Sequence, residues 1–219
     1  MLCEGRITHR YAKRELPNYQ VFDERRYFVP GHQPCVFDVA GGDGQPVRVG
    51  LLICEDAWFD APAADAKAAG AELLAVINAS PFHAGKGGER EATMAERSRA
   101  VGLPLVYAHL VGGQDEIVFE GRSFVLDANG AVAGRAISFE KSLFDIGMAR
   151  SAAGWRIDAT TDRPHSPEAD LWHALVLGVR DYIGKNGFPG AILGLSGGID
   201  SALVLAIAVD ALGKDKVRA

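Results

Sequence analysis

Short apolar runs alternate with longer amphipathic stretches through the first two-thirds of the chain. Uninterrupted apolar runs are typical of strands that are buried on both faces of a parallel or mixed sheet. The stretches between them predict helices, each closed by a glycine. Strand, helix, strand, helix and strand followed by hairpins predict a mixed α/β sheet with helices on one side. The expected strands are 5–13, 35–39, 47–54, 72–78 and 105–111, two strands around a turn at 127–130 and an extended piece at 139–146, and the expected helices are 61–70 and 89–101.

The pattern changes near Ala149. The segment 149–165 has weak periodicity and predicts a linker between a domain at 1–148 and a second domain at 166–219. Ser166-Pro167-Glu168 has the cap, the proline and the carboxylate of a helix start. A buried strand, a glycine-rich turn and an apolar helix follow, and Val217 begins a further strand, so we expect both domains to be incomplete. The first helix of the second domain is expected to bury a stripe of Leu171, Leu175, Val179 and Ile183.

Composition excludes several classes of function. The net charge of −5 offers no basic surface for nucleic acid. Three cysteines without a CxxC pair argue against a disulfide framework and a zinc site, and they fit a reducing compartment. The N-terminus does not resemble a signal peptide, and no apolar run approaches membrane-spanning length. We therefore expect a cytoplasmic protein without nucleic-acid or membrane partners.

Cys54 ends the apolar run that begins at Val49 and is followed by two carboxylates, Glu55 and Asp56. Open α/β sheets place their chemistry at the carboxyl ends of strands, which makes Cys54 a candidate nucleophile. The alternative is a buried structural thiol, because free cysteine is among the most buried residue types.

A second candidate site lies between the expected strand at 191–195 and the helix at 202–212. Adjacent glycines let the backbone approach an anion, and the first amides of a helix attract negative charge. The stretch lacks the Gly-Lys-Ser/Thr ending of a Walker A loop, and the carboxylate of Asp200 suggests a Mg²⁺ ligand. The alternative is an ordinary strand-to-helix turn. The residues of this expected phosphate-binding loop are Gly194, Leu195, Ser196, Gly197, Gly198, Ile199, Asp200 and Ser201.

Four stretches resemble known families. Ser-Gly-Gly-Ile-Asp-Ser at 196–201 resembles the pyrophosphate loop of ATP pyrophosphatases. Lys-Arg-Glu-Leu-Pro-Asn-Tyr-Gln-Val-Phe-Asp-Glu at 13–24, Ile-Cys-Glu-Asp at 53–56 and Asn-Ala-Ser-Pro-Phe-His-Ala-Gly-Lys at 78–86 resemble the nitrilase-type amidase domain of glutamine-dependent NAD⁺ synthetases. The resemblance implies an incomplete nitrilase-like α-β-β-α sandwich, followed by the first strand–loop–helix of a Rossmann-like ATP pyrophosphatase domain.

The resemblance also implies roles for single residues. Cys54 would attack the carboxamide of glutamine, Lys13 would stabilise the oxyanion, and Tyr19, Ser80 and Lys86 would hold the amino-acid end of the substrate. The complete enzyme would pass ammonia to the second site, where Mg·ATP activates deamido-NAD⁺ for amidation to NAD⁺. The complete enzyme is also expected to be a homo-oligomer.

One part of the family pattern has no counterpart here. The general base of the nitrilase triad is a glutamate well before the lysine, and Glu4 is the only carboxylate ahead of Lys13. Side chains of neighbouring strand residues point away from each other, which directs Glu55 and Asp56 away from Cys54. We therefore expect the base to lie outside this chain and the chain alone to be inactive. Two alternatives stay open: an amidase without synthetase activity, and an inactive truncated remnant.

Overall fold

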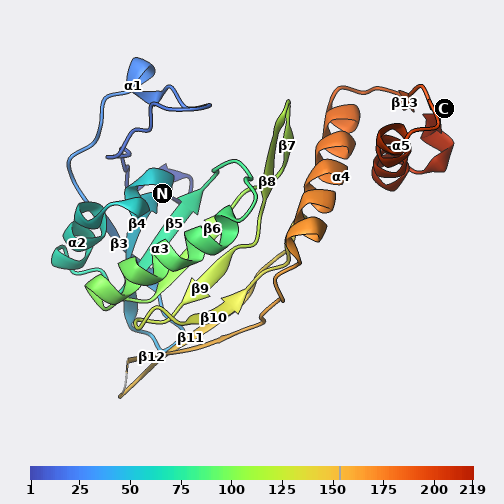
Figure 1. The fold of residues 1–219 in the computed structure, drawn as a ribbon. Helices are drawn as coiled ribbons and strands as arrows, with labels where there is room; N and C mark the ends of the chain where they lie inside the picture. Colours follow the sequence, from blue (N-terminus) through green and yellow to red (C-terminus); the bar gives the residue numbers. More distant parts are fainter. Residues whose placement is uncertain (153) are drawn as a thin grey trace.

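A six-stranded mixed sheet forms the centre of the computed structural model, which describes residues 1–152 and 154–219 (Figure 1). The spatial order is β10-β9-β6-β5-β4-β3. The three central strands run parallel, and their neighbours on both sides run antiparallel. This arrangement confirms the predicted mixed α/β class. The strands are β3 (Cys35–Ala40), β4 (Pro46–Ile53), β5 (Leu73–Asn78), β6 (Leu105–His109), β9 (Phe124–Leu126) and β10 (Val132–Arg135).

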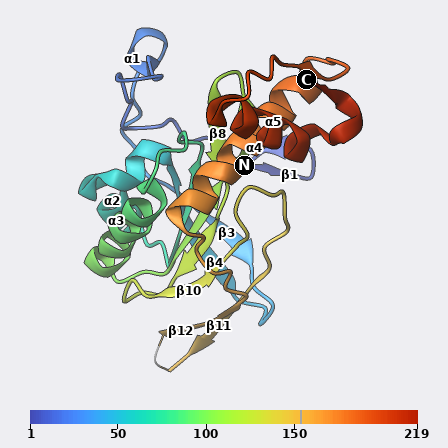
Figure 2. The same ribbon diagram turned by 45° about the vertical axis from the view of Figure 1, so that its right-hand side comes forward.

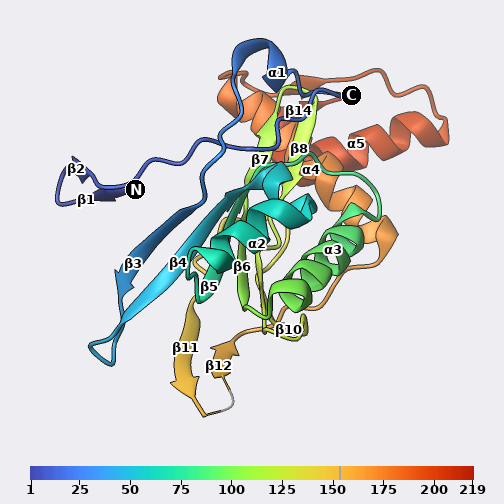
Figure 3. The ribbon, with the colours of Figure 1, turned by 90° about the vertical axis from the view of Figure 1, so that its left-hand side faces the viewer.

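Two helices, α2 (Asp60–Ala68) and α3 (Lys86–Val101), lie on the same side of this sheet (Figure 3). The side chains facing them form the core, where Leu74 of β5 and Met94 of α3 are fully buried. Alternation along β5 points Ile77 to the opposite face, where it is 56% exposed. The sheet therefore presents one packed face and one face with exposed apolar side chains.

The remaining elements are short hairpins and the C-terminal helices. Helix α4 lies along the β7–β8 hairpin, and α5 lies beside α4 (Figures 1 and 2). Leu177 of α4 packs against Phe139, and the Asp181 carboxylate accepts a hydrogen bond from the backbone N–H of Gly113 at 2.8 Å. These elements are β1 (Leu2–Cys3), β2 (Arg6–Ile7), α1 (Glu24–Tyr27), β7 (Val111–Gln114), β8 (Ile117–Glu120), β11 (Ile146–Ser151), β12 (Gly154–Ala159), α4 (Pro167–Lys185), β13 (Ala191–Ile192), α5 (Ile199–Leu212) and β14 (Val217–Arg218).

Several sequence predictions are confirmed at this level. The turn at 127–130 joins β9 to β10. Ser166 caps α4 by accepting from the backbone N–H of Ala169 at 3.2 Å. Val217 begins a strand that pairs in parallel with β13.

No helix among the described residues is long and apolar enough to cross a membrane.

Other predictions of secondary structure are wrong. The expected strand at 5–13 is a two-residue hairpin arm followed by irregular chain, and 139–146 has no regular strand before Ile146. The expected linker at 149–165 contains most of the β11–β12 hairpin. In α4 the buried positions are Ala174 and Leu177, whereas Leu171 and Leu175 are about half exposed, because the helix meets β7–β8 along a neighbouring face.

The segment that replaces the first expected strand is held by one buried carboxylate. Asp56 is fully buried, and its two oxygens accept from the Tyr11 hydroxyl (2.8 Å), the backbone N–H groups of Arg14 (2.9 Å) and Glu15 (2.8 Å), and the N–H of Ile53 (3.0 Å). The backbone N–H groups at 14 and 15 thus bind a side chain instead of a neighbouring strand. Asp56 therefore joins residues 11–15 to the end of β4.

We expect Asp56→Asn to lower the free energy of unfolding by about 3 kcal/mol, because a neutral amide turns an NH₂ group toward buried donors. Urea denaturation measures the loss. Asp65→Asn is the matched control, since Asp65 contacts the same segment through an exposed ion pair with Arg14. The control substitution should lower the free energy of unfolding by less than about 1 kcal/mol. Equal losses in the two variants would contradict the central role of Asp56.

Candidate functional site

Cys54 lies at the turn between the end of β4 and a 3₁₀ helix at Cys54–Trp58. Its φ angle is +49°, a left-handed conformation that costs energy for a residue with a side chain. The hydrogen bond from the Ile53 N–H to Asp56 closes this turn at 3.0 Å. The thiol is 8% exposed. A strained turn at the carboxyl end of a central strand is where other hydrolase folds present their nucleophile.

Five effects act on the pKa of the Cys54 thiol. Burial raises the pKa above the ordinary value and is the largest effect, and the nearby carboxylates of Glu55 and Glu24 raise it further. The ammonium of Lys13 and a backbone hydrogen bond with Ala79 lower the pKa in part. Because the effects that raise the pKa outweigh those that lower it, the resting group is a protonated thiol at neutral pH.

Lys13 is paired with a carboxylate that the sequence argument did not consider. The Lys13 ammonium donates to both oxygens of Glu24 at 2.8 Å, and both side chains are mostly buried. Lys13, Glu24 and Cys54 line one cavity of about 590 Å³. Glu4, the only carboxylate before Lys13, lies in the exposed turn between β1 and β2. The structure therefore brings Glu24, and not Glu4, to the predicted lysine.

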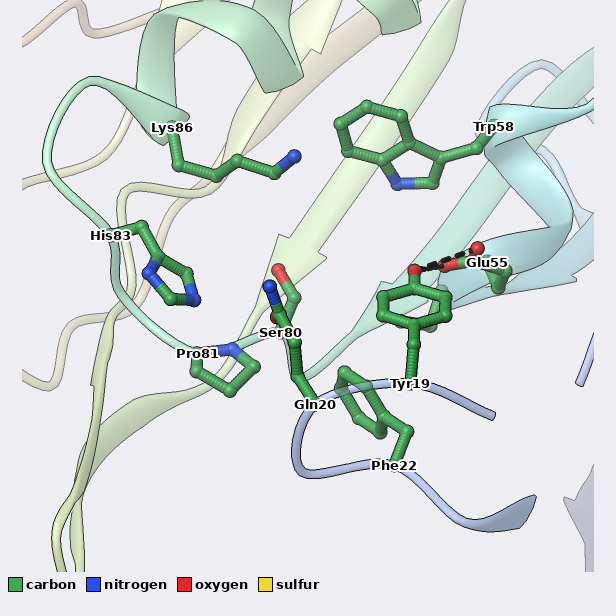
Figure 4. Close-up of a pocket in the computed structure, with 10 residues that line it drawn as sticks. Tyr19, Gln20, Phe22, Glu55, Trp58, Ser80, Pro81, His83 and Lys86 are labelled. Carbon is green, nitrogen blue, oxygen red and sulfur yellow. Dashed lines mark hydrogen bonds between the residues drawn. The ribbon is translucent and has the colours of Figure 1, made fainter. Parts of the chain in front are cut away.

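A second cavity, of about 240 Å³, opens on the other side of the nucleophile. Cys54 lines it together with the three predicted substrate-binding residues. Figure 4 shows these three, Tyr19, Ser80 and Lys86, around the cavity. The remaining lining residues are Gln20, Phe22, Glu55, Trp58, Pro81 and His83.

Opposite charges stand on different sides of this cavity. The Tyr19 hydroxyl contacts the Glu55 carboxylate at 2.8 Å, and burial together with this hydrogen bond raises the pKa of Tyr19 to about 12. The Lys86 ammonium extends toward Trp58 and lies 4.4 Å from the centre of its ring (Figure 4). A ligand with both an ammonium and a carboxylate matches this arrangement.

Ser80 lies between the Glu55 side and the Lys86 side of the cavity, and a buried polar network binds it. Its hydroxyl accepts from Nδ2 of Asn78 at 3.2 Å and from Nη2 of Arg90 at 3.0 Å, and Arg90 forms an ion pair with Glu120. His109 contacts the Ser80 carbonyl oxygen at 3.1 Å. Burial lowers the pKa of His109, so its ring is neutral near pH 7. Ser80 is therefore fixed at both its hydroxyl and its carbonyl group.

Sequence reasoning missed three contributors to the site. Glu55 was expected to point away from Cys54, but the 3₁₀ turn replaces strand alternation and places both residues in the same cavity. Glu24 comes after Lys13 in the chain, and the loop between them folds back so that the two side chains meet. Arg90 looked like one charged position on the polar face of a helix. The pair Lys13–Glu24 forms within an irregular loop and the pair Arg90–Glu120 joins residues far apart in sequence, so no helix or strand periodicity encodes either of them.

The second candidate site is an open loop ahead of α5. Gly197 has a φ angle of +86°, which favours glycine, and a Cβ atom there would meet no neighbouring atom. The Ser196 backbone N–H donates to the Ser201 hydroxyl at 3.3 Å, and the two hydroxyl oxygens lie 3.1 Å apart. Helix α5 begins at Ile199 and presents its unpaired first-turn amides to the loop.

The loop has the donor chemistry of a phosphate site. Backbone amides, the hydroxyls of Ser196 and Ser201 and the open space at Gly197 fit a pyrophosphate group. Asp200 lies in the first turn of α5 and is exposed. One carboxylate together with substrate phosphates is a usual Mg²⁺ environment. Within residues 1–152 and 154–219, no cluster of three or more His, Cys, Asp or Glu residues could hold a metal by itself.

Comparison with known families divides the chain into two parts. The carbon-nitrogen hydrolase family matches residues 3–154, and the NAD synthase family matches residues 171–219. A glutamine-dependent NAD(+) synthetase of Xylella fastidiosa is 50% identical over 100% of this chain and 40% of its own length. One from Thermotoga maritima is 34% identical over 98% of this chain and 42% of its own length. The chain thus spans about two-fifths of the length of the curated relatives it matches.

Solved structures agree with this division. The glutamine-dependent NAD⁺ synthetase of Acinetobacter baumannii, solved with ADP, superposes with a TM-score of 0.91 at 40% identity, over 99% of this chain and 40% of that chain. A carbon-nitrogen hydrolase of Helicobacter pylori superposes with a TM-score of 0.54 at 27% identity, over 63% of this chain and 51% of that chain. These relatives confirm the predicted resemblance to glutamine-dependent NAD⁺ synthetases. Since one family matches well over half of its residues, the chain belongs to the carbon-nitrogen hydrolase family and carries an NAD synthase segment behind that part.

Proposed function

We propose that the hydrolase part of this chain binds glutamine and forms a thioester with it at Cys54. The observation that carries the proposal is the cavity in which Cys54 lies with an ammonium, Lys86, and a carboxylate, Glu55. Glutamine has the complementary pair of charges at its amino-acid end and a carboxamide at the other. We assign the binding of this amino-acid end to Tyr19, Ser80 and Lys86.

The proposed chemistry exchanges the carbon–nitrogen bond of the amide for a thioester bond. The Sγ atom forms a bond to the carboxamide carbon, the carbon–nitrogen bond breaks, and nitrogen leaves as ammonia with the proton that the thiol gives up. Water then hydrolyses the thioester to glutamate and restores the thiol. Lys13 stabilises the oxyanion, and Glu24 holds the Lys13 ammonium in place.

We further propose that the complete protein uses this ammonia to amidate deamido-NAD⁺. The loop at 194–201 would hold the phosphates of ATP, with Asp200 as a ligand of the Mg²⁺ ion that accompanies them. There the nicotinate carboxylate of deamido-NAD⁺ would attack the α-phosphorus of ATP and release pyrophosphate, and ammonia would then displace AMP from the adenylate to give the amide. We place the domain boundary in 149–165, ahead of α4. The free cysteines favour a cytoplasmic location, and homo-oligomerisation of the complete protein stays a prediction.

Alkylation of Cys54 tests the proposal directly. A chloroketone analogue of L-glutamine should modify Cys54, and L-glutamine should slow that reaction while D-glutamine should not; peptide mass spectrometry measures both effects. Cys3 is exposed and serves as an internal control, because its alkylation should not respond to glutamine. Cys54→Ala should abolish the protected modification. Equal protection by the two enantiomers, or none, would refute glutamine recognition.

The pH dependence of this alkylation follows from the pKa of Cys54. Thiolate is the reactive form, and burial raises the pKa, so the rate should rise with pH to a midpoint above that of an ordinary cysteine thiol. Lys13→Met removes the cation that lowers the pKa and should move the midpoint further up. Stopped-flow alkylation with iodoacetamide measures this shift. A midpoint that falls, or one that does not move, would show that Lys13 does not act on the thiol.

For the second site we expect Asp200→Asn to weaken binding of Mg·pyrophosphate about tenfold, which corresponds to about 1.4 kcal/mol. Isothermal titration calorimetry with and without Mg²⁺ measures the effect. Asp210→Asn is the matched control at the other end of α5, where Asp210 accepts a hydrogen bond from Trp172. Similar losses in both variants, or binding without any need for Mg²⁺, would contradict the assignment of Asp200.

A further inference from the structure

The ion pair Arg90–Glu120 lies behind the substrate cavity and has no part in the chemistry described so far. Arg90 is 3% exposed and Glu120 is 4% exposed. Arg90 comes from α3 and Glu120 from the end of β8. Two charges buried together at this depth cost desolvation energy that their attraction only partly offsets. Such a pair needs an explanation beyond stability.

The contacts of Ser80 supply that explanation. A hydroxyl group has one proton to donate and two lone pairs that accept. Arg90 cannot accept a hydrogen bond, so the Nη2 contact at 3.0 Å occupies one lone pair of Ser80. The NH₂ group of Asn78 occupies the other at 3.2 Å. With both lone pairs filled from behind, the Ser80 proton is free to point into the cavity.

We infer that Arg90 is a positioning residue that fixes the Ser80 hydroxyl as a hydrogen-bond donor to the carboxylate of the bound amide substrate. This inference rests on the proposed glutamine binding. Arg90 makes a charge-assisted bond to Ser80, which polarises the hydroxyl and makes it a stronger donor. Glu120 neutralises the buried guanidinium and holds it through Nη1.

The consequence is that the cavity selects which charged group of the ligand binds beside Ser80. Ser80 and Lys86 line one cavity, so that cavity offers a fixed donor and a cation to an anionic group. On the other side, Glu55 offers acceptors to an ammonium. A hydroxyl that was free to rotate could serve either group, whereas a hydroxyl fixed as donor serves only the carboxylate. Arg90 thereby sets the orientation of the substrate without touching it.

A pair of probes isolates this effect in the complete 219-residue chain. The chloroketone of L-glutamine and its methyl ester carry the same electrophile, but only the first has a carboxylate. The wild-type chain should alkylate Cys54 faster with the acid than with the ester. Arg90→Met should lower this acid-over-ester ratio roughly tenfold to hundredfold, the range expected for a hydrogen bond to a charged group. Ser80→Ala should lower it similarly, and the double variant should lower it no further.

Three controls separate positioning from a general loss of structure. Arg97→Met removes another buried arginine of α3, and it should leave the ratio unchanged even if the melting temperature falls. Arg90→Lys retains a donor that cannot accept, and it should restore most of the ratio. The iodoacetamide rate at Cys54 should be equal in the wild-type chain and in the Arg90 variants. If Arg90→Met does not fold, Arg90→Gln replaces it, because a neutral amide can accept the Ser80 proton.

The outcomes distinguish the inference from the proposed function. A wild-type chain without any preference for the acid overturns both. A wild-type preference that survives Arg90→Met, or that falls additively in the double variant, overturns only the role of Arg90. A failure of the Arg90 role alone is expected if the Asn78 side chain presents its oxygen to Ser80 and accepts the hydroxyl proton.

Discussion

The buried carboxylate of Asp56 is the constraint on which the candidate site depends. It belongs to the turn that carries Cys54, and it binds the backbone of the segment that carries Lys13. A neutral side chain could not satisfy so many donors in a dry environment, and a longer one would not fit the tight turn. The same carboxylate closes the end of β4 at Ile53 and fixes the strained backbone of the nucleophile. Cation and thiol are thus brought together by one side chain that takes no part in the proposed reaction.

A second constraint joins the two family segments. Helix α4 precedes the phosphate loop but packs on the hydrolase part, through Leu177 against Phe139 and through Asp181 against Gly113. Phe139 also contacts Phe82, which lies between cavity residues of the loop after β5. The loop that carries Ser80 is therefore in packing contact with the helix that leads to the second site. This contact gives a physical connection between two sites that lie far apart in sequence.

Local patterns predicted most of the fold and only part of the site. Apolar runs gave the central strands within two or three residues, and Ser166 correctly marked the start of α4. The strand expected at 5–13 failed because the Tyr11 hydroxyl and the amides just after it, at 14 and 15, bind the distant carboxylate of Asp56, which hydrophobic periodicity does not register. The prediction of which α4 positions are buried was wrong, because a helix with apolar residues on several faces can pack in more than one rotation about its axis. Glu24 could have been found only by asking which carboxylate would balance a buried lysine.

The resting state of the thiol follows from these same contacts. Lys13 is neutralised by Glu24, so its field at Cys54 is that of a dipole and not of a free cation, and burial keeps the proton on sulfur. The thiolate is the form that attacks the carboxamide carbon, so this proton must leave the sulfur before the carbon–sulfur bond forms. The leaving nitrogen must in turn gain a proton to depart as ammonia, and the proton taken from the thiol serves that step. The pairing of Lys13 with Glu24 therefore keeps the resting site unreactive, and a general base has to take the thiol proton at the moment of attack.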